Sequence, residues 1–159
     1  MINIVAEGVS AEIMDVLEAQ GLQVRRSLEV EIPQLPEDIT MVDDSDLMDM
    51  ATKYMGNYNF LLTQVACAEL AVTEQEDNLD FANAEMLINL TETQPKMSAT
   101  LMKAHILTNE NIKTMSDNLL KAKAYHKLLK TMLDNAERSY QLTSRELTRR
   151  TAAFKTRTF

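Results

Sequence analysis

The sequence predicts a mainly α-helical, oligomeric protein built on two long antiparallel helices that form a helical hairpin, with a small N-terminal α/β unit. Two observations support this fold class. Only three Gly and three Pro occur in 159 residues, so turns are few and the elements are long. Apolar residues recur at steps of three or four through most of the chain from residue 43 onward, which is typical of packed helices.

This pattern divides the chain into four parts. Residues 1–32 form the small N-terminal α/β unit, and residues 33–42 are a linker marked by two prolines. Residues 43–152 form the long helical hairpin. Residues 153–159 are a basic C-terminal tail.

The N-terminal unit has a β-α-β pattern. Residues 2–5 are apolar enough for a short strand, and residues 22–32 alternate loosely as a second strand. Between them Ser10 is the predicted N-cap of a short helix, and Gly21 stands where a glycine typically follows a helix C-terminus.

The first long helix begins near the acidic cluster at residues 43–46, where Asp43 or Ser45 is the predicted cap and acidic side chains suit the positive end of the helix dipole. Pro95 closes the segment. The predicted packing seam of this helix is Leu47, Met50, Tyr54, Tyr58, Leu61, Val65, Ala68, Val72, Gln75, Leu79, Ala82, Met86 and Leu90.

After Pro95, residues 97–107 predict a short helix, and residues 108–111 either cap the next helix or are absorbed into it. A second long helix of about 40 residues follows, about 60 Å long. Its predicted seam is Ile112, Met115, Leu119, Ala122, His126, Leu129, Leu133, Ala136, Tyr140, Thr143 and Leu147. Beside this seam, Leu120, Leu128 and Met132 form an apolar flank that the hairpin leaves uncovered, so we expect it to be an oligomer interface.

Charge is divided unequally along the chain. Residues 1–80 carry 17 acidic and three basic residues, and residues 81–159 carry seven acidic and 13 basic residues, for formal charges of −14 and +6. This asymmetry indicates either a basic arm for an acidic partner or two faces that meet during self-assembly.

The basic residues of the second long helix gather on one face. At 100° per residue they fall within an arc of about 100°, away from the apolar seam. We call this set the basic stripe: Lys123, Lys127, Lys130, Arg138, Arg145 and Arg149. The only acid on the arc is Asp134, at a spacing that permits pairing with Lys130 and Arg138. Arg150, Lys155 and Arg157 continue the positive charge toward the C-terminus.

Three interpretations of the stripe stay open. It can bind nucleic-acid phosphates, with bases stacking on Tyr140, Phe154 or Phe159. It can be a solvated helix face whose cations favour the negative end of the dipole. It can also meet the acidic first helix of another subunit.

The composition favours no catalytic, metal or cofactor site. His105 and His126 lack partners at metal-ligand spacing, and the single Cys67 lies between two alanines as a small core residue. The lone cysteine and the absence of a signal peptide or a membrane-length apolar run predict a soluble, cytoplasmic, non-enzymatic protein.

From about residue 33 to 150 the chain resembles the UvsY-like recombination mediators of tailed bacteriophages. The resemblance rests on residues 35–39, on Tyr54, Tyr58 and residues 61–62 and 68–69 of the first long helix, and on the closing run from Leu128 through Ala136 and Tyr140 to residues 144–150.

The resemblance implies a non-catalytic helical protein that forms a ring, binds single-stranded DNA and loads a RecA-like recombinase onto strands coated by single-strand-binding protein, in the host cytoplasm if phage-encoded. The family carries a basic-aromatic motif after its first long helix, where residues 84–90 here hold no basic side chain. DNA binding would therefore fall to the basic stripe and to Arg150, Lys155 and Arg157. The alternative function is a structural or adaptor protein, such as a virion component or assembly partner, whose acidic and basic faces drive self-association.

Overall fold

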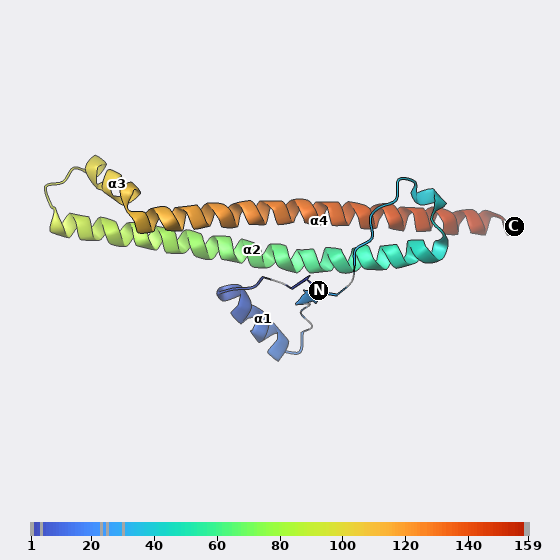
Figure 1. Ribbon diagram of the computed structural model, residues 1–159. Helices are drawn as coiled ribbons and strands as arrows, with labels where there is room; N and C mark the ends of the chain where they lie inside the picture. Colours follow the sequence, from blue (N-terminus) through green and yellow to red (C-terminus); the bar gives the residue numbers. More distant parts are fainter. Residues whose placement is uncertain (1, 4, 23, 25, 30, 158–159) are drawn as a thin grey trace.

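A computed structural model shows that two very long helices dominate the fold (Figure 1). The structure describes residues 2–3, 5–22, 24, 26–29 and 31–157, and only the backbone of residues 2–3 and 155–157. Its elements are β1 (Ile2–Asn3), α1 (Val9–Ala19), β2 (Ser27–Leu28), the 3-10 helix η1 (Ile39–Met41), α2 (Asp44–Thr93), α3 (Ala99–Thr108) and α4 (Glu110–Arg157).

Local capping chemistry sets the ends of the long helices. The Asp43 carboxylate accepts a hydrogen bond from the Asp46 backbone N–H at 2.9 Å and so caps α2, as predicted. Helix α2 ends at Thr93, two residues before Pro95, because the residue preceding a proline disfavours helical geometry. Ser98 caps α3 through the Leu101 N–H, and the Asn109 side chain accepts from the Asn111 and Ile112 N–H groups at the start of α4.

Helices α2 and α4 run antiparallel and pack along most of their length, so the predicted helical hairpin is confirmed (Figure 1). At the centre of the contact the core pairs large with small side chains: Leu61 and Ala68 of α2 cluster with Leu129 and Ala136 of α4. Tyr58, Val65 and Leu133 pack against this cluster. All residues of both predicted seams are buried or half-buried.

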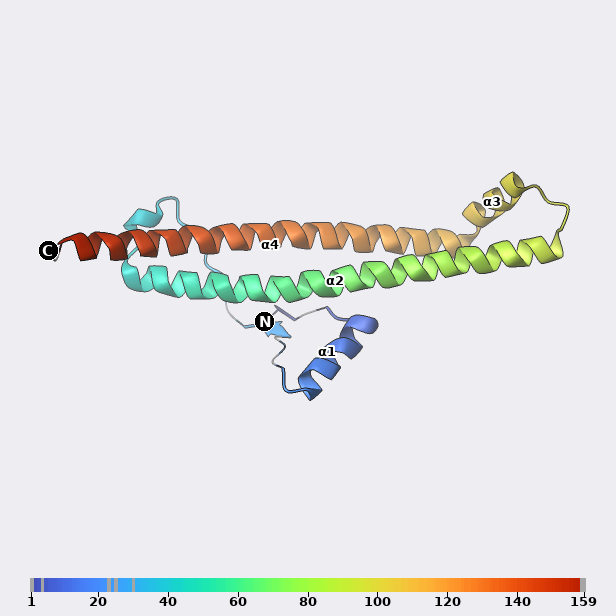
Figure 2. The same cartoon turned by 180° about the vertical axis from the view of Figure 1, so that it is seen from behind.

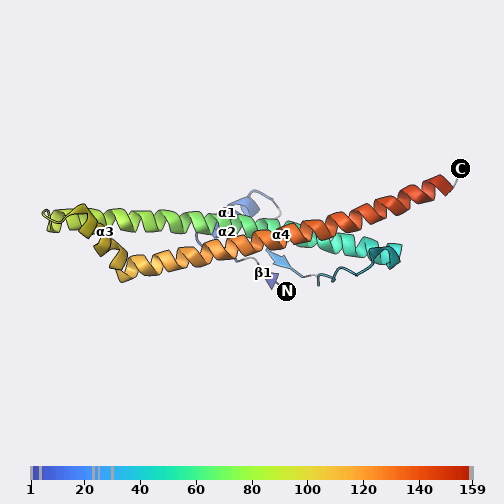
Figure 3. The same ribbon diagram turned by 90° about the horizontal axis from the view of Figure 1, so that it is seen from above.

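The seams repeat every seven residues, which gives the hairpin its shape. On α4 one row is Ile112, Leu119, His126, Leu133, Tyr140 and Leu147. A seven-residue repeat drifts relative to a straight 3.6-residue helix, so two helices that keep it in contact must wrap around each other. Figure 3 shows the result: α2 and α4 cross and separate toward both ends, and α3 bridges the gap where α2 ends and α4 begins.

Two polar atoms interrupt the seam. Gln75 Oε1 and His126 Nε2 are buried without a hydrogen-bond partner in the structure. A buried unsatisfied polar group costs about 1–3 kcal/mol, so this layer is a weak point of the hairpin. The prediction that His126 belongs to the packing seam is confirmed.

Helix α1 lies on the side of α2 away from α4 (Figures 1 and 2). Its contact with α2 brings Met14 Sδ within 3.7 Å of Cys67 Sγ, and burial raises the pKa of the Cys67 thiol. Cys67 is 5% exposed, which confirms it as a core residue. Gly21, at φ 82°, follows α1 and its N–H donates to the Glu18 carbonyl, the role predicted for it.

The prediction that Ser10 caps α1 is wrong. The helix begins two residues earlier than predicted, at Val9, with Gly8 as N-cap at φ 56°. The Ser10 hydroxyl instead donates to the Glu7 carbonyl at 2.9 Å. The positive φ at position 8 favours glycine, because other residues rarely adopt it. An added Cβ would also lie 2.5 Å from Glu74 Oε2, so the Glu74 side chain would have to move.

Two predicted boundaries also differ from the structure. The strands are only two residues long and pair antiparallel, Ile2 with Leu28 and Asn3 with Ser27. Ile4, Gln23, Arg25 and Val30 of the predicted strands lie outside the described residues. Helix α4 continues through Arg157, past the predicted end at residue 152, because Ala152 and Ala153 favour helix and no glycine or proline follows.

Candidate nucleic-acid interface

The basic stripe lies along one exposed face of α4, and four of its six cations have no ion-pair partner among the described residues. These four are Lys127, Lys130, Arg138 and Arg145. Asp134 makes no ion pair with its neighbours Lys130 and Arg138, so the anticipated local neutralisation is not seen in the described part of the chain. The four span 18 residues, about 27 Å along the helix axis.

The other two stripe cations are engaged inside the chain. Lys123 Nζ lies 2.6 Å from Glu76 Oε1 of α2, with both side chains about half exposed. Arg149 donates two hydrogen bonds of 2.7 Å to Glu146, although its own side chain is 62% exposed. The exposed pair of Lys123 with Glu76 contributes little to stability, so Lys123 can exchange partners readily. Arg149 is held by a carboxylate that is itself buried.

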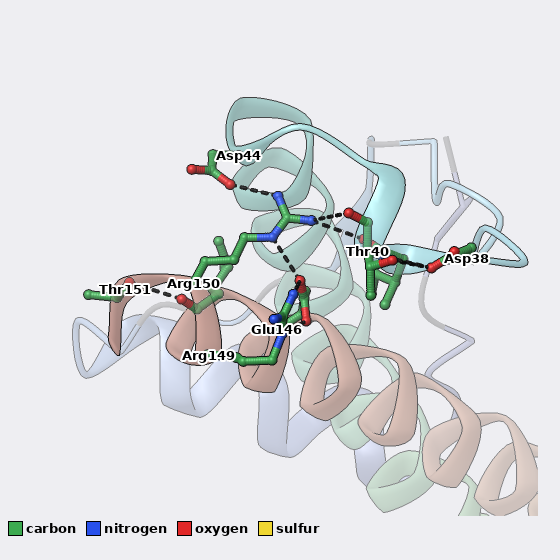
Figure 4. Close-up of polar contacts among 9 residues, drawn as sticks. Asp38, Thr40, Asp44, Glu146, Arg149, Arg150 and Thr151 are labelled. Carbon is green, nitrogen blue, oxygen red and sulfur yellow. Dashed lines mark hydrogen bonds and ion pairs between the residues drawn. The ribbon is translucent and has the colours of Figure 1, made fainter. Parts of the chain in front are cut away.

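Arg150 does not belong to the stripe. Its guanidinium donates to Glu146 Oε1 at 2.7 Å, to Asp44 Oδ1 at 2.6 Å, and to the Thr40 and Ile39 carbonyls at 2.9 and 3.3 Å (Figure 4). These groups come from α4, from the start of α2 and from η1. We call this arrangement the Arg150 clasp, because one side chain joins three elements.

The seam pattern explains why Arg150 turns inward. It follows Thr143 by seven residues, in the same row as Leu129 and Ala136, and therefore faces α2. Only 19% of its side chain is exposed. The sequence analysis predicted Arg150 as a nucleic-acid-binding residue. Its position seven residues after Thr143 was the signal in the sequence that predicts a place in the packed interface.

The clasp also perturbs a carboxylate. Glu146 is 7% exposed, and hydrogen bonds from Arg149 and Arg150 lower its pKa to about 2. Because the folded pKa lies below the ordinary value of 4.5, the pair stabilises the fold fully above pH 4.5 and loses this contribution as the pH falls toward 2.

We therefore expect Glu146→Gln to lower the melting temperature at pH 7, since Arg150 would lose a charged partner in a half-buried site. The difference from wild type should shrink steadily between pH 4.5 and 2, where the wild-type carboxylate becomes protonated. Thermal unfolding followed by circular dichroism across this range measures both effects. Asp117→Asn, at an exposed acid without an ion pair in the described chain, is the matched control; an equal response in both variants would contradict the clasp.

The hairpin places the acidic start of α2 beside the basic end of α4. The contact of Arg150 with Asp44 and the pair of Lys123 with Glu76 both cross between these helices. Part of the charge asymmetry seen along the sequence is thus neutralised within one chain. Within the stripe, four cations remain without an ion-pair partner among the described residues.

The aromatic residues expected near the stripe are only partly suited to stacking on bases. Tyr140 is half-buried in the seam and lines a cavity of about 340 Å³ with Met48, Met55 and Leu147. Phe154 is 78% exposed near the end of α4. Phe159 and the side chains of Lys155 and Arg157 lie outside the described residues.

The predicted oligomer flank is exposed. Leu120, Leu128 and Met132 are 68%, 65% and 54% exposed. Met132 also borders a cavity of about 270 Å³ between the hairpin and the linker, lined by Pro33 and Leu35.

No family model, curated protein or solved structure matches this chain. Across the described residues, no three His, Cys, Asp or Glu side chains gather in a way that could hold a metal ion. None of the helices in that part of the chain combines the length and apolar character needed to span a membrane.

Proposed function

We propose that this protein is a non-catalytic, oligomeric single-stranded-DNA-binding recombination mediator that helps to load a RecA-like recombinase. The observation that carries the proposal is the row formed by Lys127, Lys130, Arg138 and Arg145, which are exposed on one face of α4 and have no ion-pair partner in the described chain. Cations of this kind bind the phosphates of nucleic acid and release the counterions condensed around them. The resemblance to UvsY-like mediators supplies the recombinase and single-strand-binding protein as partners.

Binding along one helix face makes the protein a scaffold for the strand and not a catalyst. A row about 27 Å long can contact several successive phosphates, and an oligomer multiplies such contacts on one strand. The acidic surface of α2 on the same hairpin opposes other approaches, which restricts the strand to the stripe.

Fluorescence anisotropy of a labelled single-stranded oligonucleotide, with light scattering on the same samples, tests the proposal. We expect saturable binding by an oligomer at low salt. An oligomer that leaves the oligonucleotide free at low salt would contradict the DNA-binding role.

A second candidate is a structural or adaptor protein whose acidic and basic faces drive self-association. The acidity of α2 and its long uncovered apolar face favour it. In that case added salt would dissociate the oligomer, and DNA would not compete with subunit contact.

A further inference from the structure

We infer that the outer face of α2 is a subunit interface, and that it is covered by the outer face of α4 from a second copy of the chain. The inference deepens the self-association in the proposed function and rests on it. It identifies which surface meets the apolar flank of α4.

The outer face of α2 is an apolar strip that nothing in the described chain covers. At 100° per residue its members fall in an arc of about 100°, roughly opposite the seam that packs on α4. The large exposed residues on this arc are Leu62 (42%), Leu70 (40%), Phe81 (72%) and Ile88 (60%). Helix α1 docks along one edge of this arc, where it meets Cys67 and Glu74, and leaves those four apolar residues exposed. Exposed apolar strips of this length are typical of interaction surfaces.

The outer faces of α2 and α4 share one residue pattern. Leu, Ala, Leu and Thr occur at the same spacing on both: Leu62, Ala66, Leu70 and Thr73 on α2, and Leu120, Ala124, Leu128 and Thr131 on α4. All eight residues are exposed. Each helix therefore presents a second apolar seam in addition to the one inside the hairpin, as helices do when they pack on both sides.

The charges beside these two seams have opposite signs. Glu69 and Asp80 flank the α2 strip, and Lys127 and Arg138 occupy the equivalent positions on α4. None of the four has an ion-pair partner among the described residues. Both pairs are 11 residues apart, so both acid–base contacts can form in one alignment. Such complementarity sets the partner and the register of an interface.

Charge also excludes the simplest alternative, in which α2 packs on α2 of a second copy. That contact would bring the acids of both strips together, and like charges across an interface oppose association. The contact of α2 with α4 is heterologous, so a pair of copies keeps one unused α2 face and one unused α4 face, and further copies can add. Lys127 and Arg138 pair with the α2 acids at the rim of this contact. Within the assembly, Lys130 and Arg145 are the unpaired stripe cations that contact a bound strand.

Two variants, each altered on one face, test the inference. Leu70→Lys/Phe81→Lys places cations opposite the basic face of α4, and Leu120→Glu/Leu128→Glu places acids opposite the acidic face of α2. Light scattering after gel filtration should show each variant alone at the 18.0 kDa of one chain. We expect self-association to weaken at least about 100-fold in each variant. An equal mixture should recover a complex of at least twice that mass, because each variant retains the face that the other lacks and the altered faces carry opposite charges.

The controls separate the possible failures. Leu107→Glu, at a 74% exposed leucine of α3, should leave assembly unchanged, and circular dichroism should show unaltered helix content in all variants. If Leu120→Glu/Leu128→Glu still self-associates, or the mixture stays monomeric, this interface is wrong while the proposed oligomer stands. A monomeric wild-type protein would overturn both the interface and the self-association, and DNA binding would then be judged by anisotropy alone.

Discussion

Arg138→Glu/Arg145→Glu should lose single-stranded DNA binding while keeping its helix content. Both side chains are exposed and have no ion-pair partner in the described chain, so their reversal leaves the hairpin contacts intact. Arg145→Glu removes a phosphate contact. Arg138→Glu adds a repulsive charge in the middle of the stripe and also opposes the contact of Arg138 with the acidic α2 face of a second copy, so light scattering on the same samples separates the two effects. We expect the affinity to fall at least about 100-fold in anisotropy titrations at low salt.

The matched control reverses the same number of charges elsewhere. Lys96→Glu/Lys103→Glu alters two exposed lysines in and beside α3, also without ion pairs among the described residues. Its affinity should fall only a few-fold, through the change in net charge. Equal losses in the two double variants would show that general charge, and not the stripe, governs binding.

Leu129→Ala should destabilise the hairpin by about 2–5 kcal/mol, because it opens a cavity where Leu129 packs with Leu61 and Ala68. For a chain of this size we expect the melting temperature to fall by about 5–15 °C. Urea unfolding followed by circular dichroism measures the change. Leu107→Ala removes the same atoms from an exposed leucine and should change the stability by less than about 0.5 kcal/mol; a comparable loss there would contradict the assigned core.

Much of the hairpin could be predicted from sequence because helix packing is periodic. The spacing of Leu61, Ala68, Leu129 and Ala136 identifies buried positions without knowledge of the partner helix. Capping by Asp43 and the break at Pro95 follow from local backbone chemistry, which the sequence displays directly.

The contacts that cross between elements could not be predicted in the same way. Arg150 resembled its basic neighbours, and only the register of α4 against α2 and η1 shows that it reaches Asp44 and the Thr40 carbonyl. The cap of α1 was misplaced at Ser10 because a serine near a helix start is a strong local signal. The close approach of Glu74 to Gly8 arises from docking on α2, 65 residues away in sequence from Val9.

The stripe was predictable as a helix face, but the sequence did not show which of its cations have an ion-pair partner. Helical geometry places Lys123 and Lys130 on one arc, yet only the structure shows that Lys123 pairs with Glu76 while Lys130 has no ion-pair partner in the described chain. The outer face of α2 was not predicted, because the seam that packs on α4 already accounts for the helical periodicity of α2. The matching residue pattern on α2 and α4 was the signal in the sequence.

The most direct test of the central claim is the salt dependence of single-stranded DNA binding by the wild-type protein. If Lys130 and Arg145 of at least two neighbouring copies each neutralise one phosphate, a plot of log affinity against log salt concentration should fall with a slope of about −3 or steeper. The slope should become shallower in Arg138→Glu/Arg145→Glu. Binding whose affinity stays constant across the salt series, or no binding at the lowest salt, would contradict the assignment of the basic stripe as a phosphate-binding surface.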